Sequence, residues 1–370
     1  MILLALSVCI SEPLSRNIIR IIFVMFAVRF FIAKDKIFEL VKRYKNFLLP
    51  ISAFAWWMII SSVYGGHLVS DSDSNVYWFF FIHNTILFIP MIIMMRHKKI
   101  AEKLLIVTGI SLLIDDFFMA WQISNGVAYP ITFINDSPFQ SSILYVILLP
   151  TLLILVLNEE NDFRKKIFYG ATFFISLAAF LFLYTSFAQI VVAIILTLIL
   201  IEKFRRCKKI LLALMTIGIF FVMFQGALKD IGDLEKICAA DALTARNLIL
   251  ESTIDIIRTR PFMGVGLGNY DETLTSTLPQ VTKLKVNHAY NTYLQFWAET
   301  GIAGLILFCV IFGEILIWSR RRCGNLYGQI LFYSTLALVL YAFSDFIFER
   351  YSAMRLYWFL FGVCVTSLDR

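Results

Sequence analysis

The residues best suited to chemistry lie between Arg246 and Gly304, a polar segment flanked by strongly apolar stretches. Its most informative part is NHAYN (287–291), where one of the chain's 4 histidines stands beside two amides and an aromatic ring. An imidazole can accept or release a proton near neutral pH, and a helix start attracts anions. His288 is therefore a candidate for proton transfer, although its position would equally suit capping and packing of a helix.

Arginine and aspartate side chains supply a second group of candidates. Arg246 precedes Glu251 and Asp255 on one predicted helix, so it could simply form surface ion pairs worth a few tenths of a kcal/mol. A guanidinium is also the side chain best shaped to hold phosphate oxygens. At a boundary between water and lipid it would suit a lipid pyrophosphate head group. Asp345 and Arg350, which flank a short turn near the end of the chain, allow the same two interpretations.

The run GVGLGN (264–269) superficially matches a dinucleotide-binding fingerprint. However, Asn269 occupies the position of the third glycine of that motif, and no predicted strand precedes the run. We therefore expect a turn whose glycines let the backbone approach a ligand or a neighbouring helix closely.

Two helices are expected to position these residues. Apolar residues recur at helix-like spacing from Ala242 to Ile257, which predicts an amphipathic helix on the membrane or on the bundle. Pro261 should end that helix, and Pro279 should interrupt the chain that follows. The stretch from His288 to Glu299 is predicted to form another helix that leads into the next apolar span.

Composition places these elements in a membrane protein. The chain of 370 residues is 59% hydrophobic and 16% charged, with a mean hydropathy of +0.79, whereas soluble domains have about 25% charged residues. The net charge of +7 then indicates basic cytoplasmic loops rather than nucleic-acid binding, for which no soluble basic domain is present. The 6 cysteines show no paired or metal-ligand spacing, and we interpret them as apolar fillers or loop thiols. No cofactor is predicted. The apolar first residues lack the features of a cleaved signal, and we interpret them as a short first span.

A spanning helix needs about 20 mostly apolar residues. On this rule we expect twelve spans, at about 1–12, 17–33, 46–64, 76–95, 101–122, 140–157, 167–183, 186–202, 208–226, 301–318, 327–343 and 351–367.

The distribution of Lys and Arg predicts the orientation. Basic residues gather in alternate connections and are absent from 65–75 and 124–139. By the positive-inside rule both termini are cytoplasmic, and segment 227–300 lies on the other side of the membrane. The expected fold is thus all-α, a polytopic membrane helix bundle of about twelve transmembrane helices. It forms a single domain, 1–370, with a large, partly helical extracytoplasmic loop, 227–300, between spans nine and ten.

Several motifs, taken in order, resemble the O-antigen ligase and O-antigen polymerase family. They are Arg246, RPFMGVGLGNY (260–270), NHAYNTYLQ (287–295) and ETGIAGL (299–305), with Ser344-Asp345 and Arg350 extending the likeness loosely. The resemblance implies a metal-independent glycosyltransferase of the bacterial cell envelope that takes glycan from an undecaprenyl-pyrophosphate carrier. Ligases of the family attach the glycan to lipid A-core, whereas polymerases extend another carrier-linked repeat.

The resemblance also implies roles for individual residues. Arg246 would hold the donor pyrophosphate, and His288 would activate the acceptor hydroxyl or orient the donor. The chain differs from many members at Tyr290, where a second histidine is common, and at Phe187, where an arginine is common near the start of the eighth span. Arg258, Arg260 and Arg350 are the candidates that would compensate for the missing arginine.

We therefore expect an inner-membrane enzyme that joins a carrier-linked glycan to an acceptor hydroxyl, by inverting displacement, in an extracytoplasmic cavity. His288 would be the catalytic base, and Arg246 with Arg350 would stabilise the departing pyrophosphate. The further candidate substrate-binding residues are Arg258, Arg260, Tyr290, Asn291 and Asp345. The expected partners are the lipid-linked donor, a lipid A-core or glycan acceptor, and membrane lipids.

Two alternatives stay open beside O-antigen ligation. One is polymerisation of polysaccharide repeat units by the same chemistry. The other is transport of a lipid-linked glycan or another anion, in which the intramembrane Asp115, Asp116 and Glu314 would matter more than the loop. The absence of an obvious inverted repeat with paired broken helices weakens the transporter hypothesis.

Overall fold

The computed structural model describes most of the chain as helix. The described residues are 2–7, 14, 17–22, 25, 42–65, 98–127, 138–183, 185–207, 209, 210, 212, 214, 216, 218, 239–277, 288–349 and 351–368. No β-strand occurs within these ranges. The expected all-α class is therefore confirmed for the described part of the chain.

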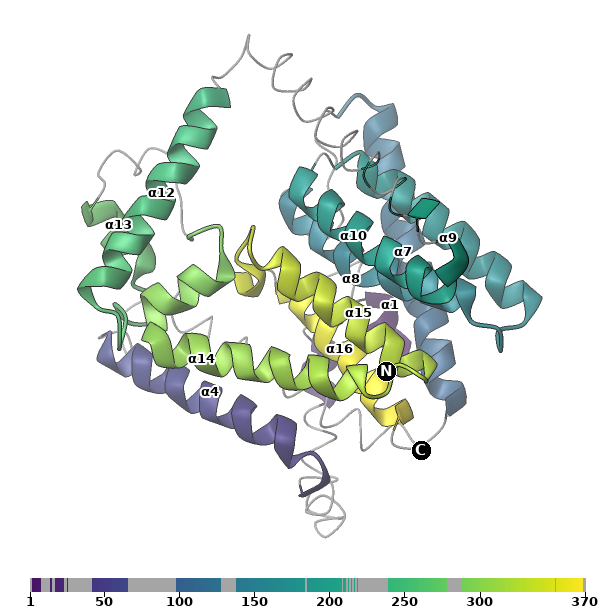
Figure 1. Ribbon diagram of the computed structural model, residues 1–370, viewed down its shortest axis with the longest axis horizontal. Coiled ribbons are helices and arrows are strands. Elements are labelled where there is room, and N and C mark those ends of the chain that lie inside the picture. The colour runs from purple at the N-terminus through teal and green to yellow at the C-terminus, as the bar shows by residue number, and fades with distance from the viewer. Residues whose placement is uncertain are drawn as a thin grey trace.

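Most of the helices coincide with apolar stretches of the sequence, and Figure 1 shows their arrangement. They are α1 (Ile2–Ser7), α4 (Lys45–Tyr64), α7 (Lys98–Ser124), α8 (Pro138–Leu157), α9 (Phe163–Leu181), α10 (Ser186–Lys203), α12 (Ala239–Thr259), α13 (Tyr270–Thr277), α14 (Thr292–Arg320), α15 (Leu326–Tyr341) and α16 (Tyr351–Leu368). Two short 3₁₀ turns follow α10 and α15, namely η1 (Arg205–Cys207) and η3 (Ile347–Glu349).

Among the described residues, 4 helical segments are long and apolar enough to cross a membrane. They are Lys45–Tyr64, Ile100–Ser124, Ser186–Lys203 and Thr292–Arg320, and shorter apolar helices cover Ser141–Leu157, Leu326–Tyr341 and Ala353–Leu368. The total of twelve spans stays a prediction. The expected span at 76–95 lies outside the described residues, as do most of 17–33 and much of 208–226.

Asparagine and aspartate side chains mark where several helices begin. The Asp162 carboxylate accepts a hydrogen bond from Phe163 N at the start of α9. Asn291 and Asn325 do the same at α14 and α15, where each side-chain oxygen accepts from the amide two residues later. These caps satisfy amides that have no partner within the helix, so the sequence itself specifies these starting points.

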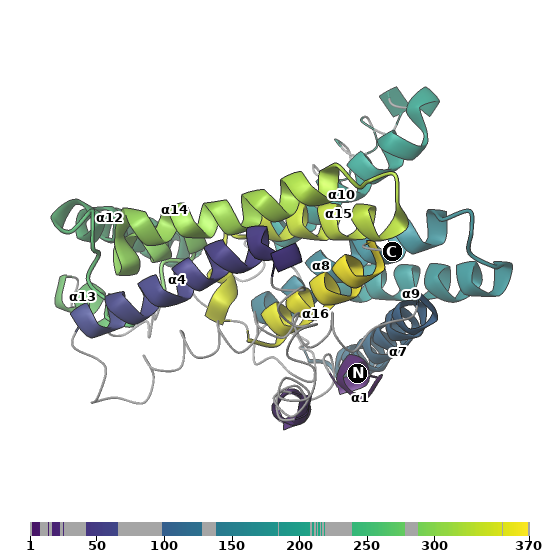
Figure 2. The same cartoon turned by 90° about the horizontal axis from the view of Figure 1, so that it is seen from below.

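The core of the bundle is formed around α8. Every residue from 141 to 155 is buried, as expected for a helix that is apolar on all sides. It packs against α9, α10 and α15, while α14 lies along α4 in both views of the ribbon (Figures 1 and 2). The bundle therefore consists of a central helix with partners on several sides and an outer pair, α4 and α14.

A buried carboxylate joins three helices inside the bundle. Asp116 on α7 accepts hydrogen bonds from the Tyr145 hydroxyl of α8, at 2.8 Å, and from the Ser176 hydroxyl of α9, at 2.5 Å. A charged or polar group inside a membrane is costly unless it is hydrogen-bonded. These contacts give Asp116 a structural function that requires no transported ligand.

The segment after residue 239 builds a small second core beside the bundle. Ile249, Ile256 and Ile257 of α12 pack with Tyr270 and Leu274 of α13. The predicted amphipathic helix is thus confirmed, and it ends at Thr259, just before Pro261. Helix α13 was not predicted, because its eight residues are mostly polar and show little apolar periodicity.

The helix expected from His288 is shorter than predicted at its start. It begins at Thr292, with Asn291 as its cap, and His288 lies in the irregular chain before it. The prediction was wrong there because apolar periodicity does not show where a cap lies. At a cap, a side-chain oxygen accepts the hydrogen bonds of the first helical amides. The helix then continues through Glu299 into the expected tenth span, with an interruption at Gly301.

Candidate functional site

His288, the predicted base, meets Asp345, one of the predicted substrate-binding residues, in the structure. His288 Nε2 lies 3.3 Å from Asp345 Oδ1, and the two side chains are 10% and 5% exposed. A carboxylate at this distance favours one orientation of the ring. The pair is therefore a buried histidine–aspartate arrangement.

Further groups hold the Asp345 carboxylate. Its Oδ1 accepts a hydrogen bond from Phe346 N at 2.9 Å, and the Tyr341 hydroxyl approaches Oδ2 at 3.5 Å. The Tyr341 hydroxyl also lies 3.2 Å from the Ser142 hydroxyl of α8. A polar chain thus connects the central helix of the bundle to the carboxylate that faces His288.

Thr292 ties the start of α14 to the turn that carries Asp345. Its hydroxyl donates to Asp345 O at 2.6 Å and accepts from Ile347 N at 3.1 Å. Its backbone N–H donates to Ala342 O at 2.9 Å. Because Thr292 is fully buried, these three bonds fix the two backbones against each other without competition from water.

Tyr290 and Asn291 occupy the chain between His288 and Thr292. The Tyr290 ring lies 4.6 Å from the imidazole, centroid to centroid, and its backbone has a φ of +50°. A non-glycine residue in this region is uncommon and often belongs to a functional site. The Asn291 side chain caps α14 and also donates to Phe343 O at 3.2 Å. In this structure its polar atoms thus hold the turn, and substrate binding by Asn291 stays a prediction.

The glycine turn packs on the interruption of α14. Gly264, Gly266 and Gly268 all have positive φ, which confirms the predicted need for glycine there. Val265 N and Gly266 N donate to the carbonyls of Ala298 and Glu299, at 2.8 and 2.9 Å. Gly301 has a φ of +69°, and a methyl group on it would overlap the Phe262 carbonyl. The close approach that the sequence predicted is therefore made to a helix of the same chain.

The end of α4 completes this attachment. The Ser61 hydroxyl donates to Glu299 O at 3.2 Å and accepts from Leu267 N at 3.1 Å. The Asn269 amide donates to Gly65 O at 2.9 Å. Turn 264–269 is thus held between α4 and α14, next to the segment that carries His288.

Tyr270 anchors α13 beneath the same turn. Its hydroxyl lies 2.5 Å from the Thr253 hydroxyl of α12, and burial raises the pKa of Tyr270 well above its ordinary value. The hydroxyl therefore stays protonated and available for this contact at physiological pH. The contact connects the two helices of the second core.

The predicted arginines are less completely defined. Arg246 lies in α12, but its side chain is outside the described part of the structure, as is the whole of Arg350. Arg258 is exposed and pairs with Asp255 at 3.1 Å, and Arg260 is also exposed. Within the described residues neither guanidinium contacts the His288–Asp345 pair. Phe187, at the position where the family often has arginine, is 42% exposed near the start of α10.

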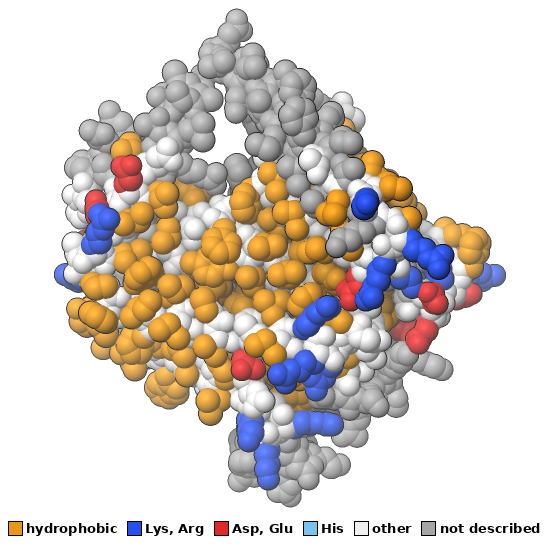
Figure 3. Space-filling model, in the orientation of Figure 1, with side chains coloured by type: hydrophobic (Ala, Val, Ile, Leu, Met, Phe, Trp, Pro, Cys, Tyr) orange, Lys and Arg blue, Asp and Glu red, His pale blue; other side chains and the backbone are white. Residues whose placement is uncertain are grey.

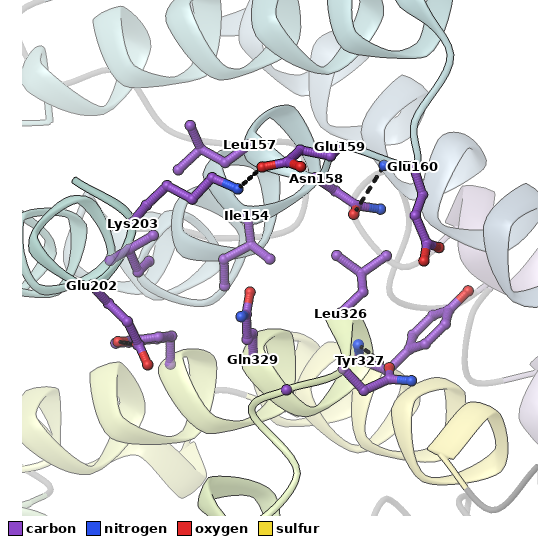
Figure 4. A pocket seen from close by; sticks show the side chains of 14 residues that line it. Ile154, Leu157, Asn158, Glu159, Glu160, Glu202, Lys203, Leu326, Tyr327 and Gln329 are labelled. Atoms are coloured by element: carbon purple, nitrogen blue, oxygen red, sulfur yellow. Dashed lines mark hydrogen bonds and ion pairs between the residues drawn. The ribbon is translucent and has the colours of Figure 1, made fainter. Parts of the chain in front are cut away.

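A polar cavity of about 460 Å³ lies at the other end of the bundle, near the ends of α8 and α10 and the start of α15. Lys203 pairs with Glu159 across it (Figure 4). Glu202 accepts hydrogen bonds from Arg320 and Tyr333. Many exposed basic side chains also gather on this side of the apolar face over α4 and α14, and a smaller group lies at the opposite edge, over α12 (Figure 3). The cavity is thus separate from His288 and belongs to the end that the charge pattern predicts to be cytoplasmic.

Three buried polar residues at the site were not singled out from the sequence. Thr292, Gln295 and Glu299 are 0%, 2% and 4% exposed, and all lie on the first turns of α14. Glu299 stands inside the ETGIAGL motif, so its presence was visible, but no periodicity or charge argument assigned it a role. The sequence signal that points to Glu299 is a carboxylate directly before a predicted span.

Fold and site together define a class of protein: an all-helical, multi-pass membrane protein with a buried histidine–aspartate pair beside a glycine turn. Residues 171–309 match the family model described as O-antigen ligase. The match includes α12, the glycine turn, His288 and the start of α14, so the family resemblance of the sequence is confirmed over this region. No curated protein matches the chain.

Proposed function

We propose that the protein is a membrane glycosyltransferase that moves glycan from an undecaprenyl-pyrophosphate carrier to an acceptor hydroxyl, as an O-antigen ligase acting on lipid A-core. The observation that carries the proposal is the His288–Asp345 pair, 3.3 Å apart, beside a segment that matches the O-antigen ligase family. The same chemistry would serve a polymerase, in which the acceptor is another carrier-linked glycan.

The proposed reaction is an inverting displacement at the anomeric carbon. The acceptor oxygen forms a bond to that carbon as the bond to the carrier phosphate breaks, and the pyrophosphate leaves with the electron pair. His288 takes the proton of the hydroxyl. Asp345 holds the N–H of the imidazole on Nε2 and stabilises the positive charge that forms, which leaves Nδ1 as the nitrogen that accepts the proton.

Positive charge must stabilise the departing pyrophosphate. Arg246 and Arg350 are the proposed groups, because guanidinium binds phosphate oxygens through two parallel hydrogen bonds. Arg260 is a further candidate, since it is exposed near the end of α12, whereas Arg258 already pairs with Asp255. No step in this scheme requires a metal or a cofactor.

The acceptor must reach an imidazole that is largely covered. His288 is 8% exposed, and Tyr290 is one of the side chains beside it. Entry of the hydroxyl therefore requires the Tyr290 ring or its neighbours to move. Its left-handed backbone conformation is a strained state of about 1–3 kcal/mol, and relief of this strain would favour such a movement.

The test is transfer by purified protein in lipid nanodiscs. Carrier-linked glycan is mixed with lipid A-core or with a second carrier-linked glycan, and products are identified by mass spectrometry. Glycan on lipid A-core supports ligation, and a lengthened carrier-linked chain supports polymerisation instead. In a separate assay with the protein reconstituted in vesicles, labelled carrier that crosses the membrane without a new glycosidic bond would support transport.

Variants assign the residues in the same assay. His288→Ala and Arg246→Ala should each abolish measurable transfer, whereas Arg206→Ala, in the exposed η1 turn at the other end of α10, should not. Transfer at the wild-type rate by His288→Ala would refute the assignment of the base. Transfer at the wild-type rate by both site variants would refute the proposed site.

A further inference from the structure

A buried polar relay connects the glycine turn to the residue after His288. Ala289 N donates to Gln295 Oε1 at 2.8 Å, and Gln295 is 2% exposed. Glu299 lies one helical turn further along α14, on the same face, and its buried carboxylate interacts with the Gln295 amide. The backbone beside His288 is therefore connected, through one amide, to a buried carboxylate.

The carboxylate of Glu299 is in turn held by the glycine turn. Gly268 N donates to Glu299 Oε1 at 3.3 Å, and the backbone N–H of Tyr270 interacts with the same carboxylate. The backbone carbonyl of Glu299 accepts from Gly266 N and from the Ser61 hydroxyl. The backbone and the side chain of Glu299 together therefore contact α4, turn 264–270 and the first turn of α14.

The direction of these hydrogen bonds gives the relay its specificity. Gln295 must accept from Ala289 and donate to Glu299, and an amide side chain of this length can do both at once. Glu299 must accept from several N–H groups, and both oxygens of a carboxylate can do so. An amide at this position would place an NH₂ group, which cannot accept, next to one of these donors. Burial makes each mismatch costly, because water cannot replace the missing partner.

We infer that Gln295 and Glu299 are positioning residues, which hold the backbone at Ala289 and thereby keep the His288 imidazole against Asp345. The inference rests on the proposed role of His288. It extends that role, because the rate of transfer would then depend on which of Gln295 and Glu299 donates and which accepts, although neither touches the reacting atoms.

The experiment exchanges the two side chains. Gln295→Glu retains the acceptor for Ala289 but loses the donor to Glu299, and Glu299→Gln sets an amide nitrogen against the donors of the turn. In the double variant, the carboxylate at position 295 accepts from Ala289 N and from the amide nitrogen at position 299. The amide oxygen at position 299 accepts from the turn, so the relay is restored with its polarity reversed. Gln329→Met is the control, because this half-buried glutamine of α15 lines the polar cavity at the other end of the bundle.

Each single variant should lower kcat by about tenfold or more with little change in KM for the donor, since small misplacement of a catalytic group has effects of this size. The double variant should recover most of kcat, and Gln329→Met should retain it. Single variants at the wild-type rate, or a double variant no faster than the singles, would overturn the inference.

A second measurement does not depend on activity. Diethyl pyrocarbonate modifies accessible imidazoles, and its rate at His288, followed by mass spectrometry, should rise in the single variants and fall again in the double variant. An unchanged rate in folded single variants would exclude positioning even if kcat falls. If His288→Ala retains transfer, the proposed function fails, while this measurement still tests whether the relay holds His288.

Discussion

His288 Nε2 and Asp345 Oδ1 are 3.3 Å apart because the chain returns to the same end of the bundle after two helices. His288 precedes α14 and Asp345 follows α15, and these helices pack against each other across a short connection. Helices joined by a short connection run antiparallel, so the start of the first meets the end of the second. The pair is thus a direct product of the α14–α15 hairpin.

This pair predicts a graded loss of activity. His288→Ala should reduce kcat by roughly 10²- to 10⁴-fold, the usual contribution of a positioned base. Asp345→Asn should reduce kcat less, by about tenfold or more, because the imidazole remains but loses its orienting charge. Single-turnover transfer rates measure both effects. Asp116→Asn, which alters a buried carboxylate elsewhere in the bundle, serves as the control, and an equal loss in that variant would contradict the specific role of Asp345.

The attachment of the Asp345 turn to α14 can be tested at Thr292. Thr292→Val preserves the shape of the side chain but leaves Ile347 N without its acceptor, at a cost of about 1–3 kcal/mol for a buried group. Hydrogen exchange at the amides of 345–347 should accelerate, and kcat should fall with it. Thr197→Val removes a hydroxyl that bonds only within its own helix, so neither quantity should change there. Unaltered exchange in Thr292→Val would show that other contacts hold the turn.

The interruption of α14 predicts a strong preference for glycine at position 301. Gly301→Ala places a side chain at a φ of +69°, where it also overlaps the Phe262 carbonyl. The variant should therefore be less stable by about 1–3 kcal/mol or more. Thermal unfolding in detergent should show a lower midpoint. Gly313→Ala on the same helix meets nothing within 4 Å and should be neutral or stabilising by up to about 1 kcal/mol. Equal midpoints for the two variants would contradict the close packing of Gly301 against the Phe262 carbonyl.

The exposed arginines should differ in their effect on donor binding. Arg260→Ala should raise KM for the carrier-linked donor, because it removes a charge with no carboxylate partner among the described residues. Arg258→Ala should have the smaller effect, since Arg258 already pairs with Asp255, and an exposed pair of this kind stabilises by at most about 1 kcal/mol. KM measured at two salt concentrations checks the assignment, because phosphate contacts weaken as salt increases. A larger effect for Arg258 would reverse their proposed roles.

Local sequence was sufficient for the features that depend on local physics. The apolar run at about 140–157 is long enough to predict a spanning helix, and the structure has the apolar helix α8 there. Pro261 ends α12, and the glycines at 264, 266 and 268 adopt the positive φ for which no other residue is as well suited. Periodicity, proline and glycine act over a few residues, so their effects are visible before the chain is folded.

Contacts between distant segments were decided only by tertiary structure. The sequence identified His288 and Asp345 separately, but only the packing of α14 on α15 brings their side chains together. The sequence shows Glu299 within a motif. The groups that surround this residue, however, come from α4, the glycine turn and α14. Such contacts depend on the relative position of whole helices, which no periodicity encodes. The sequence therefore determined the helices, the turn and the candidate residues, whereas packing determined which of those residues meet.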